Sequence, residues 1–351
     1  MGDESKAFGG DLTLEIHPGK APPGWDDDLL GAGGVVFHSE AWAAHKTGAG
    51  EGDPLFCLWR EGSDGEVIGR GLGIRRPGEG SRAGRFAAKL SFDSPPASTA
   101  GGRDFVAPLA AWAKRAPALV ELKLGSFDAF GAWREAPLPR LRPRLEYVLP
   151  AGGGEEELRA GMRQLARRKV KRAEKEGQEG REAHSAGELR EFVTVYRTTE
   201  ERLSQTKRGY VPDVGPDAEA FAASLEQLTT RGCGKLFAAF AGDRLEAGTF
   251  FATFGKRAYM IYSGATDEGR AAGAPFLAMF AALRELRTAG FEQINLGGAA
   301  GDAADPDSED HGLHQFKTRF GAAAEPRTSG SLLLRPLRAR AVEGARRLVR
   351  R

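Results

Sequence analysis

The chain has 351 residues, of which 41% are hydrophobic and 28% are charged, and its formal net charge is +2. These values are typical of a globular protein in water, and the length is sufficient for two domains. No apolar run approaches about 18 residues, which argues against a membrane-spanning helix. The first residues contain no apolar segment, so we expect no signal peptide. A net charge near zero gives no global indication of a nucleic-acid partner.

The two cysteines and six histidines carry little chemical signal. Cys57 and Cys233 both stand in apolar, strand-like runs, so we expect them to be small core residues in a reducing compartment. The histidines are scattered without the spacing of a metal site, and we expect no bound metal. We therefore predict a cytoplasmic location.

Residues 1–150 are predicted to form a first unit that is rich in strands. Ser39 is a candidate N-cap for a helix that carries Trp42 and Lys46. Alternating apolar residues and turn signals predict strands near residues 12–16, 54–59, 66–75, 86–92, 118–124 and 145–149, and a second helix over 104–115. The glycine run at 152–154 marks a boundary.

Residues 151–335 are predicted to form a second unit, which begins with a helix over 155–177. Between Arg159 and Lys175 this helix has eight Lys or Arg residues and one acid. The pattern predicts one basic ridge, formed by Arg163, Arg167, Lys171 and Lys175 at intervals of four. The ridge is either a solvated face or a surface for an anionic partner. Such a partner would offset a repulsion of about 0.2–0.5 kcal/mol per pair.

The rest of the second unit alternates helices and strands. Helices are expected over 187–204, 216–231 and 274–289, and strands over 235–240, 246–254, 257–262 and 291–296. The hairpin over 236–250 echoes one over 55–72, and each is later followed by a helix and a strand. Two copies of one unit would explain this weak repeat, although two apolar hairpins can also match by chance. Residues 336–351 predict a basic C-terminal helix.

The stretch His311–Gly321 contains the residue with the clearest chemical interest. Phe316 and Phe320 are four residues apart, so they share one buried face of a short helix. Lys317 lies beside that face and would point toward the Gly-rich loop at 297–301. A cation in this place suits anionic chemistry, and the alternative is a solvated lysine on a packing helix.

Four segments together resemble the FemABX family, the peptidoglycan-bridge aminoacyl transferases built from two GNAT-like units. They are Phe37–Trp42 with Lys46, Arg167–Gly177, Thr206–Tyr210, and the block from Asn295–Gly298 to Gly312–Gly321. The resemblance covers about residues 35 to 335 and implies an α/β fold class. The fold implied by the resemblance consists of two tandem GNAT-like units, each a mixed sheet flanked by helices. The coiled-coil arm that some members insert is expected to be absent.

The resemblance implies transfer of an aminoacyl group from aminoacyl-tRNA to an amine on a UDP- or lipid-linked muropeptide or a small metabolite. Lys317 and Phe316 would line the acyl-transfer site, where Lys317 stabilises the oxyanion or the leaving ribose hydroxyl. In the acceptor site, Lys46 and Arg208 would hold the diphosphate of the acceptor, and Trp42 would also contact the substrate. The ridge residues Arg167 and Lys171 would meet phosphates of the tRNA or the acceptor. No cofactor is implied.

The segment Arg270–Pro275 leaves an alternative donor open. It resembles the GNAT pyrophosphate loop, in which amides at a helix N-terminus bind coenzyme A. Its single well-placed Gly273 and the missing N–H of Pro275 disfavour, without excluding, an acyl-CoA-dependent N-acyltransferase. A non-catalytic nucleic-acid-binding module is the third class, and the lack of aromatic residues on the ridge disfavours it.

Three further expectations concern the base, the C-terminal helix and the oligomeric state. Aminolysis of an activated ester needs no covalent nucleophile, and no nucleophile signature is found. A base would come from the acidic loop, unless that loop is simply solvated; the candidates are Asp302, Asp305, Asp307 and Asp310. The basic C-terminal helix would touch tRNA or an anionic membrane surface, or serve as a solvated cap. We expect a monomer.

Overall fold

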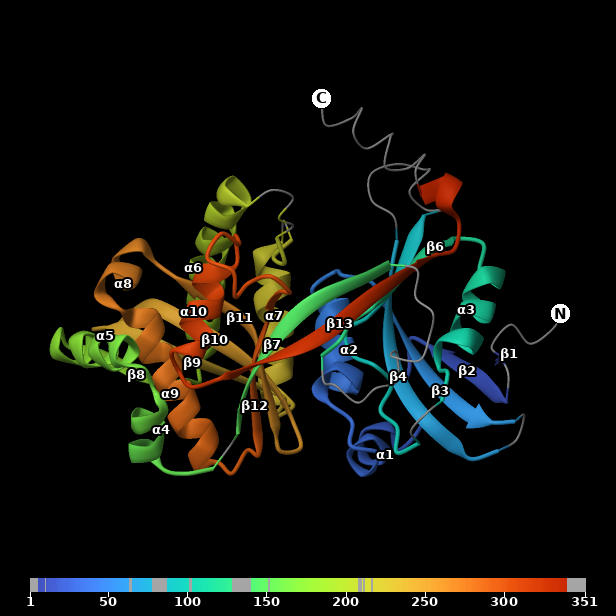
Figure 1. Cartoon of the computed structure of the whole chain (residues 1–351), viewed down its shortest axis with the longest axis horizontal. Helices are drawn as coiled ribbons and strands as arrows, with labels where there is room; N and C mark the ends of the chain where they lie inside the picture. Colours follow the sequence, from blue (N-terminus) through green and yellow to red (C-terminus); the bar gives the residue numbers. More distant parts are fainter. Residues whose placement is uncertain are drawn as a thin grey trace. The chain divides into compact units, whose positions relative to one another are not determined.

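The computed structural model describes residues 6–9, 11–62, 65–77, 87–100, 103–127, 140–150, 152–207, 210, 212–215 and 217–339. The chain divides into two compact units (Figure 1). The first comprises Met1–Thr47, Glu51–Arg142 and Arg327–Arg351, and the second comprises Gly48–Gly50 and Pro143–Pro326. The division therefore falls within strand β7 (Arg140–Pro150), slightly before the predicted boundary, and the C-terminal segment belongs to the first unit.

The first unit is built on a mixed sheet in the order β1-β2-β3-β4-β5-β6-β13. Strands β5 and β6 run parallel, and the other neighbouring pairs are antiparallel. Helix α3 (Val106–Arg115) provides the crossover that a parallel pair requires. The strands are β1 Lys6–Gly9, β2 Leu12–Pro18, β3 Asp53–Glu61, β4 Val67–Arg76, β5 Ala88–Phe92, β6 Leu119–Leu124 and β13 Ala323–Leu333.

Three short helices connect β2 to β3, and the start of the third one confirms the N-cap that was predicted at Ser39. They are α1 (Trp25–Gly31), the 3-10 turn η1 (Val36–His38) and α2 (Glu40–Gly48). The Ser39 hydroxyl accepts the backbone N–H of Trp42 at 3.1 Å, as an N-cap does. The unit's core lies between α3 and the sheet, where Leu14, Trp59 and Leu109 are fully buried.

The second unit has a mixed sheet in the order β7-β12-β11-β10-β9-β8. Strands β11 and β12 run parallel, and the other neighbouring pairs are antiparallel. The remaining strands are β8 Gln178–Ala183, β9 Gly234–Ala241, β10 Arg244–Phe254, β11 Arg257–Ala265 and β12 Gln293–Ala300. The helices are α4 Glu155–Gly161, α5 Gln164–Lys175, α6 Ala186–Thr206, α7 Ala218–Thr230, α8 Asp267–Ala272, α9 Ala274–Thr288 and α10 His311–Thr318.

Consecutive phenylalanines of β10 show that both faces of this sheet are covered. Phe251 is in the core cluster with α9 residues such as Phe280. Phe250 packs with Tyr262, whose ring contacts Phe221 of α7. Because neighbouring strand residues point to opposite faces, α9 covers one side and α6 with α7 the other. This explains why β10 is buried from Leu245 to Phe254.

The two units repeat one topology. Strands β2 to β5, helix α3 and β6 correspond to β8 to β11, helix α9 and β12, and each sheet then receives one more antiparallel strand. The hairpins that echo each other in the sequence, β3-β4 and β9-β10, occupy equivalent places. The predicted fold of tandem GNAT-like units is confirmed, and no long helical arm interrupts the described residues between α6 and α7.

The single helix predicted over 155–177 is wrong in one respect. It breaks at Met162 and Arg163, whose ψ angles of 142° and 152° are extended, so α4 and α5 are separate helices. The Arg163 N–H donates to the carbonyl of Arg319 at 2.8 Å. A tertiary hydrogen bond therefore replaces the helical one. Arg163 is the N-cap of α5 rather than a member of its helical ridge.

Candidate active site

Lys317, on the last turn of α10, is buried in the second unit. Its side chain is 2% exposed, and its Nζ donates to the carbonyl of Gly298 at 2.9 Å. The same Nζ lies 5.1 Å from the centre of the Tyr147 ring, on β7. The prediction that Lys317 points toward the Gly-rich stretch is confirmed, and the alternative of a solvated lysine is wrong.

Burial changes the proton affinity of this lysine. Desolvation disfavours the ammonium form, and the nearby Arg144 guanidinium disfavours it further. The carboxylates of Asp310 and Glu146 oppose both effects, and the pKa of Lys317 falls to about 7. Lys317 therefore holds its proton only part of the time at neutral pH, unlike an exposed lysine.

The glycines that Lys317 contacts belong to a bulge in β12 rather than to a loop. The register of β12 against β7 shifts between Asn295 and Gly298, and the strand continues to Ala300. Gly297 takes a left-handed φ of +76°, which favours glycine. Its N–H donates to the Asn295 side chain at 2.8 Å, and that side chain donates to the buried Glu146 at 2.9 Å. These bonds fix the bulge.

Tyr147 and His314 form a hydrogen-bonded pair beside Lys317. The Tyr147 hydroxyl lies 2.9 Å from Nδ1 of His314, which is one turn before Lys317 on α10. Tyr147 is fully buried, and desolvation together with the Asp310 charge raises its pKa to about 12. Desolvation, His311 and Arg163 lower the pKa of His314. Both side chains are therefore uncharged at neutral pH.

Asp310 precedes α10 and is fully engaged. One carboxylate oxygen is ion-paired with Lys207, and the other accepts the N–H of Ala300 at 2.8 Å. The Lys207 partner, the Ala300 bond and the Lys317 charge lower the pKa of Asp310, against desolvation. A carboxylate with both oxygens occupied and a lowered pKa is a poor base. The other proposed bases, Asp302, Asp305 and Asp307, are exposed in the loop before it.

Phe316 belongs to an aromatic cluster. Its ring is 5.1 Å from that of Phe276 and 5.3 Å from that of Phe320, both in edge-to-face contact. Phe320 is 1% exposed and anchors the core, as predicted, while Phe316 is partly buried against it. The geometry gives Phe316 a packing role, and its place in the transfer site stays a prediction.

The segment predicted to be a pyrophosphate loop is largely helical. Arg270 lies on α8, where it is ion-paired with Asp267 and donates to the Ala265 carbonyl at 2.8 Å. Gly273, with a φ of +97°, joins α8 to α9. Its N–H donates to Gly269 at 2.9 Å. A Cβ on Gly273 would lie 3.1 Å from the carbonyl oxygen of Lys169, so α5 packs against this junction.

The basic ridge is exposed on α5. Arg167 and Lys171 are both exposed, and within the part of the chain that the structure describes neither has an acidic partner. The Arg167 guanidinium donates to the backbone carbonyls of Arg159 and Ala160 at 3.3 and 3.4 Å. Both carbonyls lie in the last turn of α4. Arg172 does have a partner, since it is ion-paired with Glu176 at 2.6 Å.

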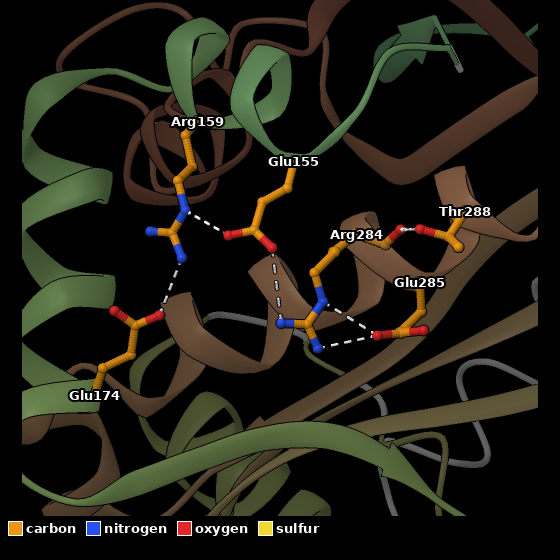
Figure 2. A network of polar contacts seen from close by, with 6 residues as sticks. All are labelled: Glu155, Arg159, Glu174, Arg284, Glu285 and Thr288. Atoms are coloured by element: carbon orange, nitrogen blue, oxygen red, sulfur yellow. Dashed lines mark hydrogen bonds and ion pairs between the residues drawn. The ribbon is translucent and has the colours of Figure 1, made fainter.

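Arg159, counted with this run in the sequence, is neutralised. Figure 2 shows its ion pairs with Glu155 at 2.8 Å and Glu174 at 3.2 Å, and Glu155 reaches Arg284 of α9. Its guanidinium also lies over the Phe280 ring at 4.2 Å. These contacts join α4, α5 and α9. They therefore stabilise the packing of α5 and do not contribute to its free basic face.

The predicted acceptor residues lie in the first unit or outside the described residues. Lys46 is buried, ion-paired with Glu51 at 2.8 Å, and lies 4.6 Å from the Trp42 ring centre. Trp42 donates its ring N–H to Asp93 at 2.9 Å. Both side chains thus have internal partners. Arg208, like residues 340–351 of the predicted C-terminal helix, lies outside the described residues.

Sequence reasoning missed several members of the site. Tyr147 is 167 positions from His314, and Glu146 is 149 positions from Asn295. The one available signal was Asn295, which stands in a motif beside the glycines. Within the described residues, no group of three or more His, Cys, Asp or Glu side chains is arranged to hold a metal. Among the described helices, none combines the length and apolarity of a membrane span.

Comparisons with known proteins agree with the fold. Residues 160–317 match the acetyltransferase (GNAT) domain family. The chain superposes on the crystal structure of FemX with a TM-score of 0.62 and 15% identity, over 89% of this chain and 96% of that one. It superposes on L-PGS from Bacillus licheniformis with a TM-score of 0.51 and 12% identity, over 95% and 98%. No curated protein sequence matches significantly.

Proposed function

We propose that this FemABX-like protein, an acyltransferase with a GNAT domain over residues 160–317, transfers an aminoacyl group from aminoacyl-tRNA to an amine acceptor. The acceptor would be a UDP- or lipid-linked muropeptide or a small metabolite. The proposal rests on the match to the GNAT domain, on the tandem fold shared with FemX, and above all on the position of α5.

The observation that carries the choice of donor is that α5 packs against the start of α9. A coenzyme A pyrophosphate needs several amides there. The N–H of Gly273 is already bonded to Gly269, that of Phe276 is bonded to Gly273, and Pro275 has none. Arg270 is held by Asp267 and Ala265. The carbonyl of Lys169 on α5 packs against Gly273, which joins α8 to α9.

The same helix offers a surface for a polyanion. Arg167 and Lys171 are exposed and unneutralised within the described residues, and Arg163 at the helix start is close enough to lower the pKa of His314. A phosphate backbone that follows the ridge would therefore have one end near α10. Phosphate contacts need positive charges in an approximate row more than base-specific groups.

The deciding experiment compares donors. The purified protein is incubated with a mixture of charged tRNAs, and separately with a mixture of acyl-CoAs. The acceptors are a UDP-linked muropeptide and a panel of small amines. We expect loss of the aminoacyl ester from tRNA and a new amide on one acceptor. Consumption of an acyl-CoA with no consumption of charged tRNA would replace the proposal by acyl-CoA-dependent N-acyl transfer.

Reversing the charge of the ridge should weaken donor binding. The double variant Arg167→Glu, Lys171→Glu is expected to raise KM for charged tRNA about 10-fold or more with a smaller effect on kcat, because phosphate contacts contribute binding energy. Arg190→Glu, at an exposed position of α6 in the same unit, is the control and should leave KM unchanged. Equal effects of both variants would show that the ridge has no special role.

A further inference from the structure

The hydrogen bond between Tyr147 and His314 leaves the other ring nitrogen of His314, Nε2, available as a hydrogen-bond donor. The sequence did not indicate this group. We propose that His314, held by Tyr147, donates its Nε2–H to the carbonyl oxygen of the donor ester as that oxygen becomes an oxyanion. This inference rests on the proposed acyl transfer. It makes His314 a catalytic residue and Tyr147 the residue that positions it.

The tautomer follows from the burial of Tyr147. A buried hydroxyl whose proton has no acceptor loses the hydrogen bond that it would make to water, so such an arrangement is disfavoured. Among the described residues, His314 Nδ1 at 2.9 Å is the only hydrogen-bond partner of the Tyr147 hydroxyl. The hydroxyl therefore donates, and Nδ1 accepts. In a neutral ring the proton must then be on Nε2, which has no partner among the described residues.

The surroundings keep the ring uncharged. Desolvation disfavours a second proton, and His311 on α10 and Arg163 at the start of α5 act in the same direction. His311 is stacked on His314 with ring centres 6.1 Å apart, and its own Nε2 lies 2.7 Å from the Gln315 amide nitrogen. A neutral imidazole that donates a hydrogen bond is an established way to polarise a carbonyl.

His314 is better placed for this contact than Lys317. Lys317 is 2% exposed and its Nζ is bonded to Gly298, whereas the His314 side chain is only partly buried. Both residues lie on one face of α10, since they are three apart. We therefore assign the oxyanion contact to His314 and the support of the β12 bulge to Lys317.

The step balances without a covalent enzyme intermediate. The lone pair of the acceptor amine forms a C–N bond to the ester carbon, and the C=O electrons move to the oxygen that accepts the His314 hydrogen bond. When the C=O bond re-forms, the C–O bond to the ribose breaks. The proton lost by the nitrogen ends on the departing ribose oxygen, so the products are an amide and a free hydroxyl.

Kinetics and the state of the ring test the inference together. His314→Ala should lower kcat about 10²-fold, the usual effect of losing one oxyanion donor, with little change in KM. His184→Ala, an exposed histidine of the same unit, is the control and should retain full activity. In protein with isotope-labelled histidine, the nitrogen resonances lost in His314→Ala should show Nε2 protonated and Nδ1 unprotonated at pH 7. Tyr147→Phe should remove that preference.

Each outcome decides. A kcat of His314→Ala within about threefold of the wild-type value would overturn the catalytic role. A ring that is protonated on Nδ1 at pH 7 would overturn the assignment, whatever the activity. If the wild-type protein transfers nothing from any donor, the proposed function fails. The resonances then still test the tautomer, and the Nε2–H form would support a donor at this position. Matching circular dichroism spectra of the variants ensure that lost activity is not lost folding.

Discussion

Replacing Lys317 by methionine should lower kcat about 10²-fold while the protein remains folded. Methionine fills a similar volume but cannot donate to the Gly298 carbonyl, which Nζ holds at 2.9 Å. The bulge of β12 would then shift relative to α10, and a displacement of about 1 Å between reacting groups can cost this factor. The measurement is steady-state transfer with whichever donor the protein consumes in the comparison of charged tRNAs and acyl-CoAs.

Two variants make this result interpretable. Lys317→Ala should be as inactive as Lys317→Met, because both lose the same hydrogen bond. Lys256→Met, at an exposed lysine between β10 and β11, is the matched control and should keep wild-type turnover. Unchanged turnover in Lys317→Met would show that neither the ammonium nor its bond to Gly298 contributes to transfer.

The same substitution should change how stability depends on pH. The pKa of Lys317 falls from 10.5 in the unfolded chain to about 7 in the folded protein, chiefly by desolvation. Between these values the unfolded state binds more protons, so the free energy of unfolding rises with pH. The slope contributed by this group is at most about 1.4 kcal/mol per pH unit, or about 5 kcal/mol over the interval.

Lys317→Met lacks the titrating amine and therefore lacks this pH dependence. The difference in the free energy of unfolding between wild type and variant, followed against pH, isolates the effect of Lys317. Urea unfolding at several pH values from 6 to 10 should show wild type gaining on the variant as pH rises. Below pH 7 the variant should be the more stable protein, since it buries no ammonium. Parallel curves for the two proteins would mean that Lys317 is as well solvated as an ordinary lysine. If the wild type is less stable than Lys317→Met below pH 7 but more active, Lys317 is a residue retained for function at a cost in stability.

Much of the fold could be predicted from local signals. Periodicity located most strands and helices of both units, and Ser39 was recognised as an N-cap. The elements that were not predicted are α1, α8, β1, β8 and β13. The echo between two hairpins reflects the repeated topology. The break between α4 and α5 was missed because Leu158, Met162 and Leu165 continue the helical spacing across it. The hydrogen bond from Arg163 to Arg319 imposes the break, and Gly161 was the only local hint.

The site was harder to predict because its partners are distant in sequence. Lys317 was found through a motif, but its burial was not, since lysines are rarely buried. Tyr147 and Glu146 come from β7 and gave no signal beyond an alternating strand pattern. The bulge that brings Asn295 and Gly298 to Lys317 depends on the register of β12 against β7, which is a tertiary property.

Strand β13 has a consequence for synthesis on the ribosome. Its residues 330–333 pair with β6 and follow the second unit in the sequence, so the first unit receives this strand only after the second unit has been made. Until then the β6 edge carries unpaired backbone groups, which invite pairing with another chain. The second unit, largely complete by residue 326, can fold first. We therefore expect the second unit to complete its fold before the first, against the order of translation.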